Sequence, residues 1–256
     1  MLSRIRLVLH RPQSADNLGA AARAMKNFGL FRLAVVAPVS WAGPPRRGGA
    51  GLAGEDVLSR AARLARHAAD VLEALTVHAD LREALGAATW TCGTTSRSIP
   101  GRKALDPRSL AVELCRRAAG GGVAVVFGEE RRGLSDAELD LCQAVCTIPT
   151  HDAYPSMNLA QAVAVVCYEI GQAVRVPGEE LAPPPAEPAR HATVEALWDL
   201  ARKVLGGAGF LNPQNPEHIL AELRRLLSRA EPTQREVELL TAALRALHRQ
   251  AGGSDG

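Results

Sequence analysis

Short apolar runs recur along the chain before residue 150, and each is bounded by glycine, proline or polar residues. Runs that are apolar at nearly every position are typical of strands buried on both faces of a parallel sheet. The pattern predicts four strands and the end of a shorter fifth, at Ile5–His10, Leu33–Ala37, Thr89–Gly93, Val123–Phe127 and Thr147–Ile148.

Helical periodicity fills the intervals between these strands. One helical stripe is formed by Leu18, Ala22, Met25 and Phe28. Gly29 follows where a glycine commonly ends a helix. Two further helices are predicted over Pro107–Ala118 and Leu159–Val174. Alternating strands and helices predict an α/β fold, with a mainly parallel sheet that is covered on both sides.

A segment rich in proline and glutamate, Val176–Ala189, divides the chain, because three consecutive prolines and several acids do not pack as a core element. The remainder is helical, with helices expected at Thr193–Leu205, after the N-cap pair Asn215-Pro216, and from Pro232 to about Arg249. We therefore expect an α/β domain over 1–175, a linker over 176–190 and a small all-α domain over 191–250.

The composition is that of a globular protein. The chain has 256 residues, 47% of them hydrophobic, and a formal net charge of +3, so the charge alone favours no class of partner. The first residues lead directly into a strand and lack the apolar core of a signal peptide. No run reaches the ~20 apolar residues of a membrane helix. We expect a cytoplasmic protein that does not enter the membrane.

The five cysteines form no CxxC pair, which indicates a reducing compartment. Cys142 and Cys146 have no His or Cys pair beside them, so no metal site is expected. Two loops are expected between the elements. One is the Gly- and Pro-rich stretch Trp41–Gly54, and the other is the basic stretch Ser96–Lys103.

Three constellations carry candidate chemistry. The first, Asn17–Arg23, lies at the turn from the first strand into the first helix, and ligands bind at the carboxyl ends of strands in open α/β sheets. Its small residues are expected to let a substrate come close, and Arg23 falls on the polar face of the helix. The alternative is an ordinary helix with an N-capping Asn17 and a solvated arginine.

The second constellation, Phe127–Leu134, follows the fourth strand directly. Gly128 would let a ligand approach the strand end, and the carboxylate of Glu130 could hold an arginine or a ribose hydroxyl. The alternative is a glycine-punctuated loop with solvated charges. The third constellation, Tyr154–Ala160, precedes a very apolar helix, which Ser156 or Asn158 could cap.

Each motif is weak alone, but their order is specific. The series N-[LMI]-G-x-x-x-R, FGxExxGL and S-[LM]-N-x-A resembles the three motifs of the SPOUT superfamily of RNA methyltransferases, in its TrmH-like 2′-O-ribose branch. The C-terminal sequence GF…NP…LRRLLSRA resembles the helical extension of the TrmJ family, which methylates the ribose at position 32 of tRNA.

The resemblance implies a SPOUT fold with a deep trefoil knot where Phe127–Gly133 and Thr147–Asn158 thread past each other, and a homodimer. It implies S-adenosylmethionine as methyl donor, with tRNA as partner. The cofactor contacts that it implies are Thr94, Thr95, Ser96, Gly128, Ile148, Pro155, Ser156 and Met157. Arg23 matches the catalytic arginine, and the expected supporting catalytic residues are Asn17, Glu130, Ser156 and Asn158.

We expect Asn17 and Glu130 to orient Arg23, and Arg23 to hold a phosphate and polarise the 2′-hydroxyl, because a guanidinium is almost never neutral enough to act as a base. Phosphate contacts should come from Arg97, Arg102, Lys103, Arg131 and Arg132. Arg224, Arg225 and Arg229 could bind RNA or equally pair with acidic residues of the C-terminal helices.

Three alternatives stay open. A sibling enzyme could methylate another tRNA or rRNA ribose, although the C-terminal extension favours the anticodon-loop enzyme. A catalytically silent RNA-binding module is disfavoured by the presence of Arg23, Glu130, Ser156 and Asn158. A nucleotide-dependent oxidoreductase is disfavoured because the GxGxxG pattern is missing.

Overall fold

The computed structural model describes residues 1–38, 54–99, 101–102, 104–175 and 187–250, with side chains omitted at 54–56. Lys103, nearly all of the loop predicted at Trp41–Gly54 and most of the linker predicted at 176–190 lie outside the described residues.

Seven parallel strands form the central sheet, in the order β3-β2-β1-β6-β4-β7-β5. The strands are Ile5–His10 (β1), Arg32–Val36 (β2), Thr76–His78 (β3), Ala88–Thr94 (β4), Ala104–Leu105 (β5), Gly122–Phe127 (β6) and Ala144–Cys146 (β7). Because every pairing is parallel, the carboxyl ends of all the strands meet at one edge of the sheet.

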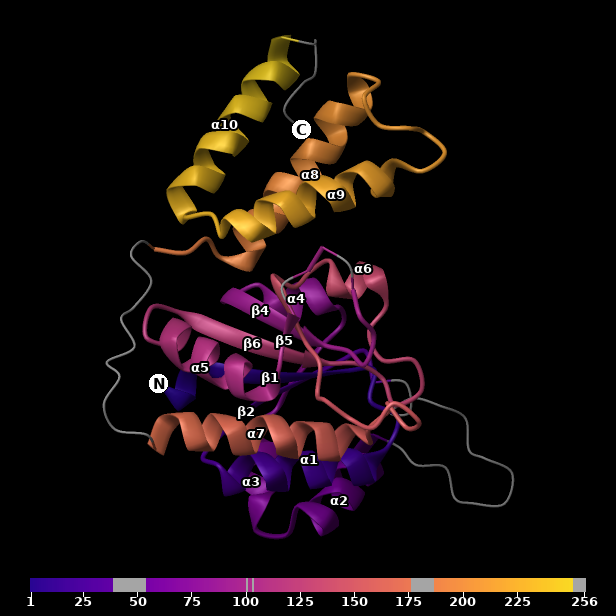
Figure 1. The fold of residues 1–256 in the computed structure, drawn as a ribbon, viewed down its shortest axis with the longest axis vertical. Coiled ribbons are helices and arrows are strands. Elements are labelled where there is room, and N and C mark those ends of the chain that lie inside the picture. The colour runs from indigo at the N-terminus through magenta and orange to yellow at the C-terminus, as the bar shows by residue number, and fades with distance from the viewer. Residues whose placement is uncertain (39–53, 100, 103, 176–186, 251–256) are drawn as a thin grey trace.

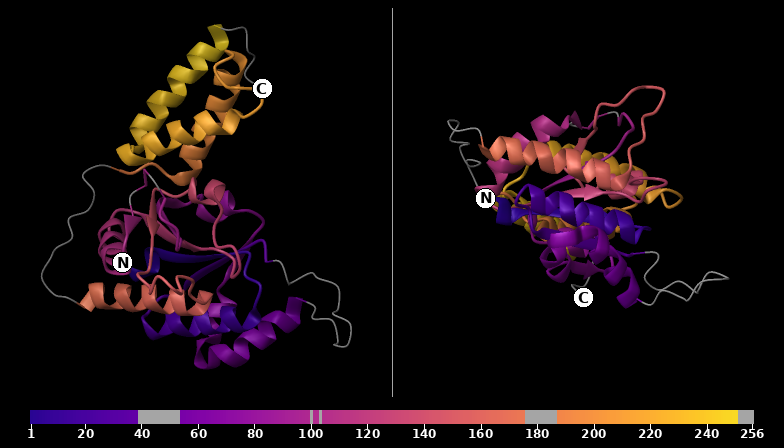
Figure 2. Two further views of the ribbon diagram at one scale, coloured as in Figure 1. Left: turned by 45° about the vertical axis from the view of Figure 1, so that its right-hand side comes forward. Right: turned by 90° about the horizontal axis from the view of Figure 1, so that it is seen from below.

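Helices cover both faces of this sheet (Figure 1). They are Ala15–Asn27 (α1), Gly54–Ala65 (α2), Ala69–Glu73 (α3), Leu81–Leu85 (α4), Pro107–Ala118 (α5), Asp136–Leu139 (α6) and Leu159–Arg175 (α7), with 3-10 turns at Leu2–Arg4 (η1) and Arg66–Ala68 (η2). One face packs against α1, α2, α3, α5 and α7, and the other against α4 and α6. Helices α1 and α7 lie side by side (Figure 2).

Most of the predicted elements are confirmed. Strand β1 and helix α5 have the predicted bounds, and Gly29 ends α1 with a positive φ of 75°. The fifth strand was expected to end at Thr147–Ile148, but β7 ends at Cys146. Ile148 lies beyond the strand and lines a cavity instead. The pattern did not predict β3 and β5, because strands of three and two residues at the sheet edges show no clear periodicity.

Close packing of α1 on α2 explains the small residues of the first constellation. A Cβ at Gly19 would lie 2.2 Å from the carbonyl oxygen of Ala61 in α2. Ala21 and Ala22 are also fully buried in the core. The expectation that these residues make room for a substrate is therefore wrong for Gly19, since a helix backbone occupies the space that it leaves.

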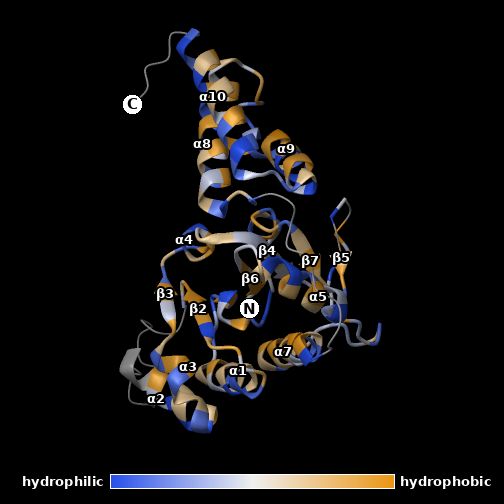
Figure 3. Cartoon of the chain, turned by 90° about the vertical axis from the view of Figure 1, so that its left-hand side faces the viewer, coloured by the Kyte–Doolittle hydropathy of each residue, from blue (hydrophilic) through white to orange (hydrophobic). Residues whose placement is uncertain are grey.

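Three helices, His191–Gly207 (α8), Pro216–Ala230 (α9) and Gln234–Gln250 (α10), form the C-terminal unit seen above the sheet in Figure 1. Their apolar faces turn toward each other (Figure 3) and bury Trp198, Leu220 and Val237. Asn215 stands at the N-cap position of α9 as predicted, but its side chain makes no capping hydrogen bond there.

Ion pairs attach this helical unit to the sheet domain. The Arg117 guanidinium lies 2.7 Å from the carboxylate of Glu231, and Arg82 lies 3.1 Å from Asp199. Arg117 is nearly buried, and it also stacks over the ring of Trp90. Arg117 also pairs with Glu113 of its own helix at 3.0 Å, so its contact with the partly exposed Glu231 extends this pair to the helical unit. Among the described residues, no helix is long and apolar enough to cross a membrane.

Replacement of Gly19 by alanine tests the α1–α2 contact. The added methyl group meets backbone atoms, which cannot move as a flexible side chain would, so we expect Gly19→Ala to lower the free energy of unfolding by about 1–3 kcal/mol. Chemical denaturation measures this loss. Gly207→Ala is the matched control, since nothing lies within 4 Å of the position of its Cβ. Equal stabilities for the two variants would contradict the packing.

Candidate functional site

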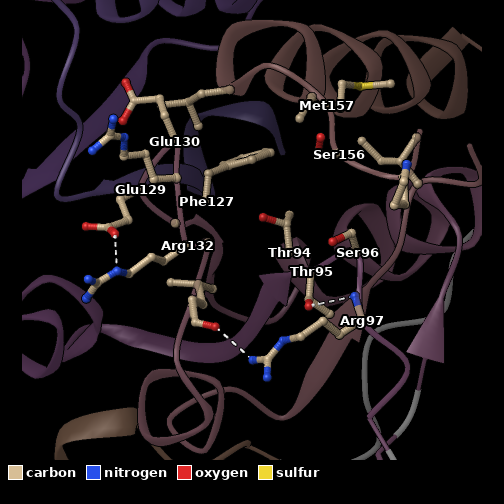
Figure 4. Close-up of a pocket in the computed structure, with 18 of the residues that line it drawn as sticks. Thr94, Thr95, Ser96, Arg97, Phe127, Glu129, Glu130, Arg132, Ser156 and Met157 are labelled. Atoms are coloured by element: carbon tan, nitrogen blue, oxygen red, sulfur yellow. Dashed lines mark hydrogen bonds and ion pairs between the residues drawn. The ribbon is translucent and has the colours of Figure 1, made fainter. Parts of the chain in front are cut away.

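A cavity of about 220 Å³ opens at the carboxyl edge of the sheet (Figure 4). Its walls are three loops, which follow β4, β6 and β7. All the residues expected to contact the cofactor line it, namely Thr94, Thr95, Ser96, Gly128, Ile148, Pro155, Ser156 and Met157. The structure thus brings together three separate loops, and the second and third constellations lie in the loops after β6 and β7. The two segments expected to thread past each other both contribute to these walls, while the knot itself stays a prediction.

The loop after β6 is folded tightly on itself. A Cβ at Gly128 would lie 2.2 Å from the carbonyl carbon of Gly133 and 2.4 Å from the amide nitrogen of Leu134. Gly133 has a positive φ of 66°, and its amide donates to the Glu129 carbonyl at 2.9 Å. Gly128 is therefore needed for the loop's own backbone to close, rather than for the approach of a ligand to the strand end as the sequence suggested.

The carboxylate of Glu130 joins this loop to the start of α1. It accepts hydrogen bonds from the backbone amide of Gln13 at 3.0 Å, from that of Ser14 at 3.2 Å and from the Asn17 side-chain nitrogen at 3.0 Å. Sequence reasoning missed Gln13 and Ser14, because they contribute backbone groups that carry no side-chain signature. The N-cap of α1 is Ser14, whose hydroxyl accepts from the amides of Asp16 and Asn17, so the alternative of an N-capping Asn17 is wrong.

Asn158 extends the same network to the third constellation. Its Nδ2 donates to Oδ1 of Asn17 at 3.1 Å. Its Oδ1 accepts from the amide of Ala160 at 2.9 Å and from that of Gln161 at 3.3 Å, so Asn158 caps α7 as one of the two expected residues. Glu130, Asn17 and Asn158 therefore form one chain of hydrogen bonds across all three motifs.

Arg23 lies elsewhere. It is exposed on α1 and lines a separate surface hollow with Lys26, Asn27 and residues 65–68. Within the described part of the chain it forms no hydrogen bond or ion pair with a side chain. The expectation that Asn17 and Glu130 orient Arg23 is wrong for a single chain, because their polar atoms are bonded to each other and to the Gln13–Ser14 backbone.

The cavity combines an apolar floor with a polar rim. Phe127, Cys146 and Leu159 are buried beneath it, and the motifs did not single out Cys146 or Leu159 as site residues. At the rim, the Thr94 hydroxyl donates to the Val126 carbonyl at 3.1 Å, and the Thr95 hydroxyl accepts from the Arg97 amide at 3.1 Å. Ser156 and Met157 are exposed on the opposite wall, as Figure 4 shows. This arrangement suits a ligand with one flat apolar part and several polar groups.

The predicted RNA-binding arginines fall into two groups. Arg131 and Arg132 are exposed at the rim, and Arg132 makes only a loose contact of 3.9 Å with Glu129. Arg97 is half exposed and donates to the Leu134 carbonyl at 3.0 Å and to Asp136 at 2.9 Å. The exposed pair can therefore contact a phosphate without losing an internal partner.

Arg102 is a correction to the predicted set. Its side chain is only 6% exposed, and it donates to the carbonyls of Leu139 and Cys142 at 2.6 and 3.1 Å and pairs with Asp140. Because both of its terminal nitrogens are bound to the protein and its charge is paired with Asp140, Arg102 holds the basic loop against α6 instead of facing RNA.

The C-terminal arginines also divide. Arg224 pairs with the buried Glu195 of α8 and stacks over Trp198, and Arg225 lies 3.2 Å from Asp140 of the sheet domain. Arg229 is exposed and forms no ion pair within the described residues. The predicted pairing with the C-terminal helices thus holds for Arg224, whereas Arg225 pairs with a carboxylate of the sheet domain.

The cavity floor and the core contain thiols that burial keeps neutral. All five cysteines are free and buried. Burial raises the pKa of Cys142, Cys146 and Cys167 to about 12. The charge of Asp106 adds to the effect of burial at Cys146. Within the described residues, no group of three or more His, Cys, Asp or Glu side chains is placed to hold a metal ion.

Removal of the Asn158 side chain should weaken both the α7 cap and the link to Asn17. We expect Asn158→Ala to lower the free energy of unfolding by about 1 kcal/mol. Asn158→Asp keeps the capping oxygen and loses only the donor to Asn17, so it should recover part of the stability in the same denaturant titration. Two variants with unchanged stability would argue against the network.

Thiol titration tests the burial of the cysteines. Only a thiolate attacks an aromatic disulfide reagent, so thiols with pKa values of about 12 should stay unreactive in the native protein at pH 8. All five cysteines should then react once the chain is unfolded in guanidinium. Rapid reaction of a native cysteine would show that the core is open.

Comparison with known proteins is consistent with this geometry. The sequence profile of the SpoU rRNA Methylase family matches residues 4–168, and that of the tRNA methyltransferase TrmJ C-terminal domain matches residues 192–256. The TrmJ protein of Yersinia pestis (strain Pestoides F), a tRNA (cytidine/uridine-2′-O-)-methyltransferase, is 35% identical over 98% of this chain and 93% of its own. A Pseudomonas aeruginosa TrmJ, named for cytidine, uridine and adenosine, is 35% identical over 99% of this chain and 97% of its own.

Solved structures agree with the fold. The crystal structure of TrmJ from Z. mobilis ZM4 superposes with a TM-score of 0.79 at 30% identity, covering 95% of this chain and 98% of that one. A putative methylase family protein from Neisseria gonorrhoeae gives a TM-score of 0.65 at 38% identity over 77% of this chain and 94% of that one. The fold is that of the SPOUT methyltransferases with a helical C-terminal extension, and the chain belongs to the TrmJ family of RNA methyltransferases.

Proposed function

We propose that this protein transfers a methyl group from S-adenosylmethionine to the 2′-oxygen of a ribose in tRNA, with the pyrimidine nucleoside at position 32 as the target. The observation that carries the proposal is the cavity lined by the second and third motifs and by the loop after β4. Hydrogen bonds of Asn17 with Glu130 and Asn158 link the first motif to these walls. The relatives named as tRNA 2′-O-methyltransferases over nearly the full length of both chains support the substrate class.

The cavity fits such a methyl donor in its chemistry. The buried Phe127, Cys146 and Leu159 would face an adenine ring, and the hydroxyls of Thr94, Thr95 and Ser96 lie on the rim where ribose and amino-acid groups would need partners. The donor supplies a methyl group that is already activated by positively charged sulfur. The protein's part is to bind it, exclude water and position the ribose hydroxyl.

Arg23 is the residue that we assign to the ribose hydroxyl. Its guanidinium would hold a phosphate next to the target and polarise the 2′-oxygen, and the proton would leave toward that phosphate. Since Arg23 lines no part of the cavity of its own chain, this role needs a second copy of the chain to bring it there. We therefore propose a homodimer, in which the exposed sides of α1 and α7, including the half-exposed Tyr168, form part of the contact.

The RNA would reach the rim of the cavity through phosphate contacts. Arg131 and Arg132 are exposed there, and Arg229 is exposed on the C-terminal unit. We keep Arg97 in this set, since its side chain is half exposed at the cavity wall. These side chains position the RNA without reading its sequence.

The choice of nucleotide is tested by mapping ribose methylation in tRNA from a strain that lacks the gene. We expect loss of one 2′-O-methyl group, at position 32, and its restoration by the purified protein with S-adenosylmethionine. Loss at another position would identify a different target. A complete set of ribose methyl groups in that tRNA, together with an inactive purified protein, would contradict the proposal.

Substitution of Arg23 tests the mechanism. We expect both Arg23→Ala and Arg23→Lys to reduce kcat for tRNA methylation by about 100-fold or more, because loss of the polarising group removes acid–base assistance. Binding of S-adenosylmethionine, measured by calorimetry, should not change. Arg108→Ala, which alters an exposed arginine on α5, is the control and should keep its activity. Near-native turnover of both Arg23 variants would show that the assignment is wrong.

A mixing experiment tests whether Arg23 acts in a second chain. Arg23→Ala and Glu130→Ala are each expected to be inactive, and mixed dimers would contain one intact site. When equal amounts are mixed at random, about half of the dimers are mixed and each of these has one intact site of two. About a quarter of all sites should then be active. Failure of any mixture to recover activity would argue against the shared site.

A further inference from the structure

Three arginines gather at the edge of the sheet opposite the cavity. Arg4 precedes β1, Arg6 lies within β1, and Arg32 is the first residue of β2. They line a hollow of about 110 Å³ at the amino ends of the strands, and the other residues around it are small or aliphatic: Ala87, Ala88, Gly122, Val123 and Ala124. The N-terminus marks this edge in Figure 1.

The charges in this cluster are not balanced by the protein. Arg6 and Arg32 are directly opposite each other in the β1–β2 register, and like charges in that position are destabilising. Burial, and then the charge of Arg32, lower the pKa of Arg6. Within the described part of the chain no carboxylate forms an ion pair with any of the three arginines.

Helix capping explains only part of this arrangement. Arg4 donates through Nη1 to the carbonyls of Ala118 and Ala119 at the end of α5, and Arg6 donates through Nη1 to the Ala84 carbonyl in α4. Arg32 makes a single long contact of 3.3 Å with the Ser3 carbonyl. A guanidinium carries five N–H donors, so most donors of the three groups stay available, and the carbonyl contacts hold two of the groups in place.

We propose that this hollow is an anion site for a phosphate group. Guanidinium groups that line one hollow match the tetrahedral oxygens of phosphate, and a bound dianion would offset the repulsion between Arg6 and Arg32. The small walls at Ala88 and Gly122 leave room for it. The phosphate comes either from the backbone of the tRNA or from a free phosphate or small phosphorylated molecule. Only the first of these two sources rests on the proposed function.

Inorganic phosphate is the direct probe. Calorimetric titration of the full chain at low ionic strength, without tRNA or methyl donor, should show saturable binding. Arg32→Gln should weaken this binding at least 10-fold, since a bidentate charged partner is lost, while Arg245→Gln on the exposed side of α10 should not. Arg32→Gln should fold normally, with a melting temperature in phosphate-free buffer no lower than that of the unaltered protein, because it removes a like-charge pair.

The salt dependence of tRNA binding separates the two sources. If the anion is a tRNA phosphate, Arg32→Gln should reduce the magnitude of the slope of log K for tRNA binding against log salt concentration by about 1. Arg245→Gln is the reference and should leave this slope unchanged. An unchanged slope together with impaired phosphate binding identifies the small-anion source. Absence of saturable phosphate binding with an unchanged slope, or equal effects of Arg32→Gln and Arg245→Gln, would overturn the site. Phosphate binding is measured without catalysis, so a failure of the methyltransferase proposal stays distinguishable from a failure of this one.

Discussion

The carboxylate of Glu130 is the constraint on which the candidate site depends. It accepts the backbone amides of Gln13 and Ser14 and the side chain of Asn17, and Asn17 in turn accepts from Asn158. Loops that are more than a hundred residues apart in sequence are held together by these few hydrogen bonds. Bonds to an ionised acceptor are stronger than neutral ones, so Glu130 fixes the loop after β6 to the start of α1, and Asn17 links both to the start of α7.

The rest of the site follows from this arrangement. Gly128 lets the loop of Glu130 close on its own backbone. The cap at the start of α7 holds the end of the loop that follows β7. The basic loop that continues from the wall after β4 is also connected to the C-terminal unit. Asp140 pairs with Arg102 of the basic loop and with Arg225 of α9, so a single carboxylate links the loop beyond Ser96 to the helical extension. The C-terminal unit is therefore joined to the segment that continues from the first cavity wall.

Sequence reasoning predicted the elements whose apolar pattern is strong, and it predicted the cavity walls only through the family resemblance. Strand β1 and helix α5 are continuous and well bounded, whereas the edge strands β3 and β5 are too short to show a period. Every residue that the resemblance implied as a cofactor contact lines the cavity, but the pattern of residues could not show what each one contacts.

The wrong expectations share one physical cause. Gly19, Gly128 and Arg102 were interpreted from what each residue type can offer a ligand, but the protein itself occupies the space or the donors. Which partner a side chain meets depends on tertiary contacts such as Gly19 on Ala61, which no local pattern encodes. The position of Arg23 outside the cavity of its own chain is a further example, because the motif that contains it does not encode which surface its side chain lines.

Hydrogen exchange of the full chain with and without S-adenosylmethionine tests most directly whether the three loops form one cofactor site. The account predicts that the methyl donor slows amide exchange simultaneously in residues 94–97, 128–134 and 148–157, because all three line the cavity. Unchanged exchange in these segments at saturating methyl donor, or protection of only one of them, would contradict it.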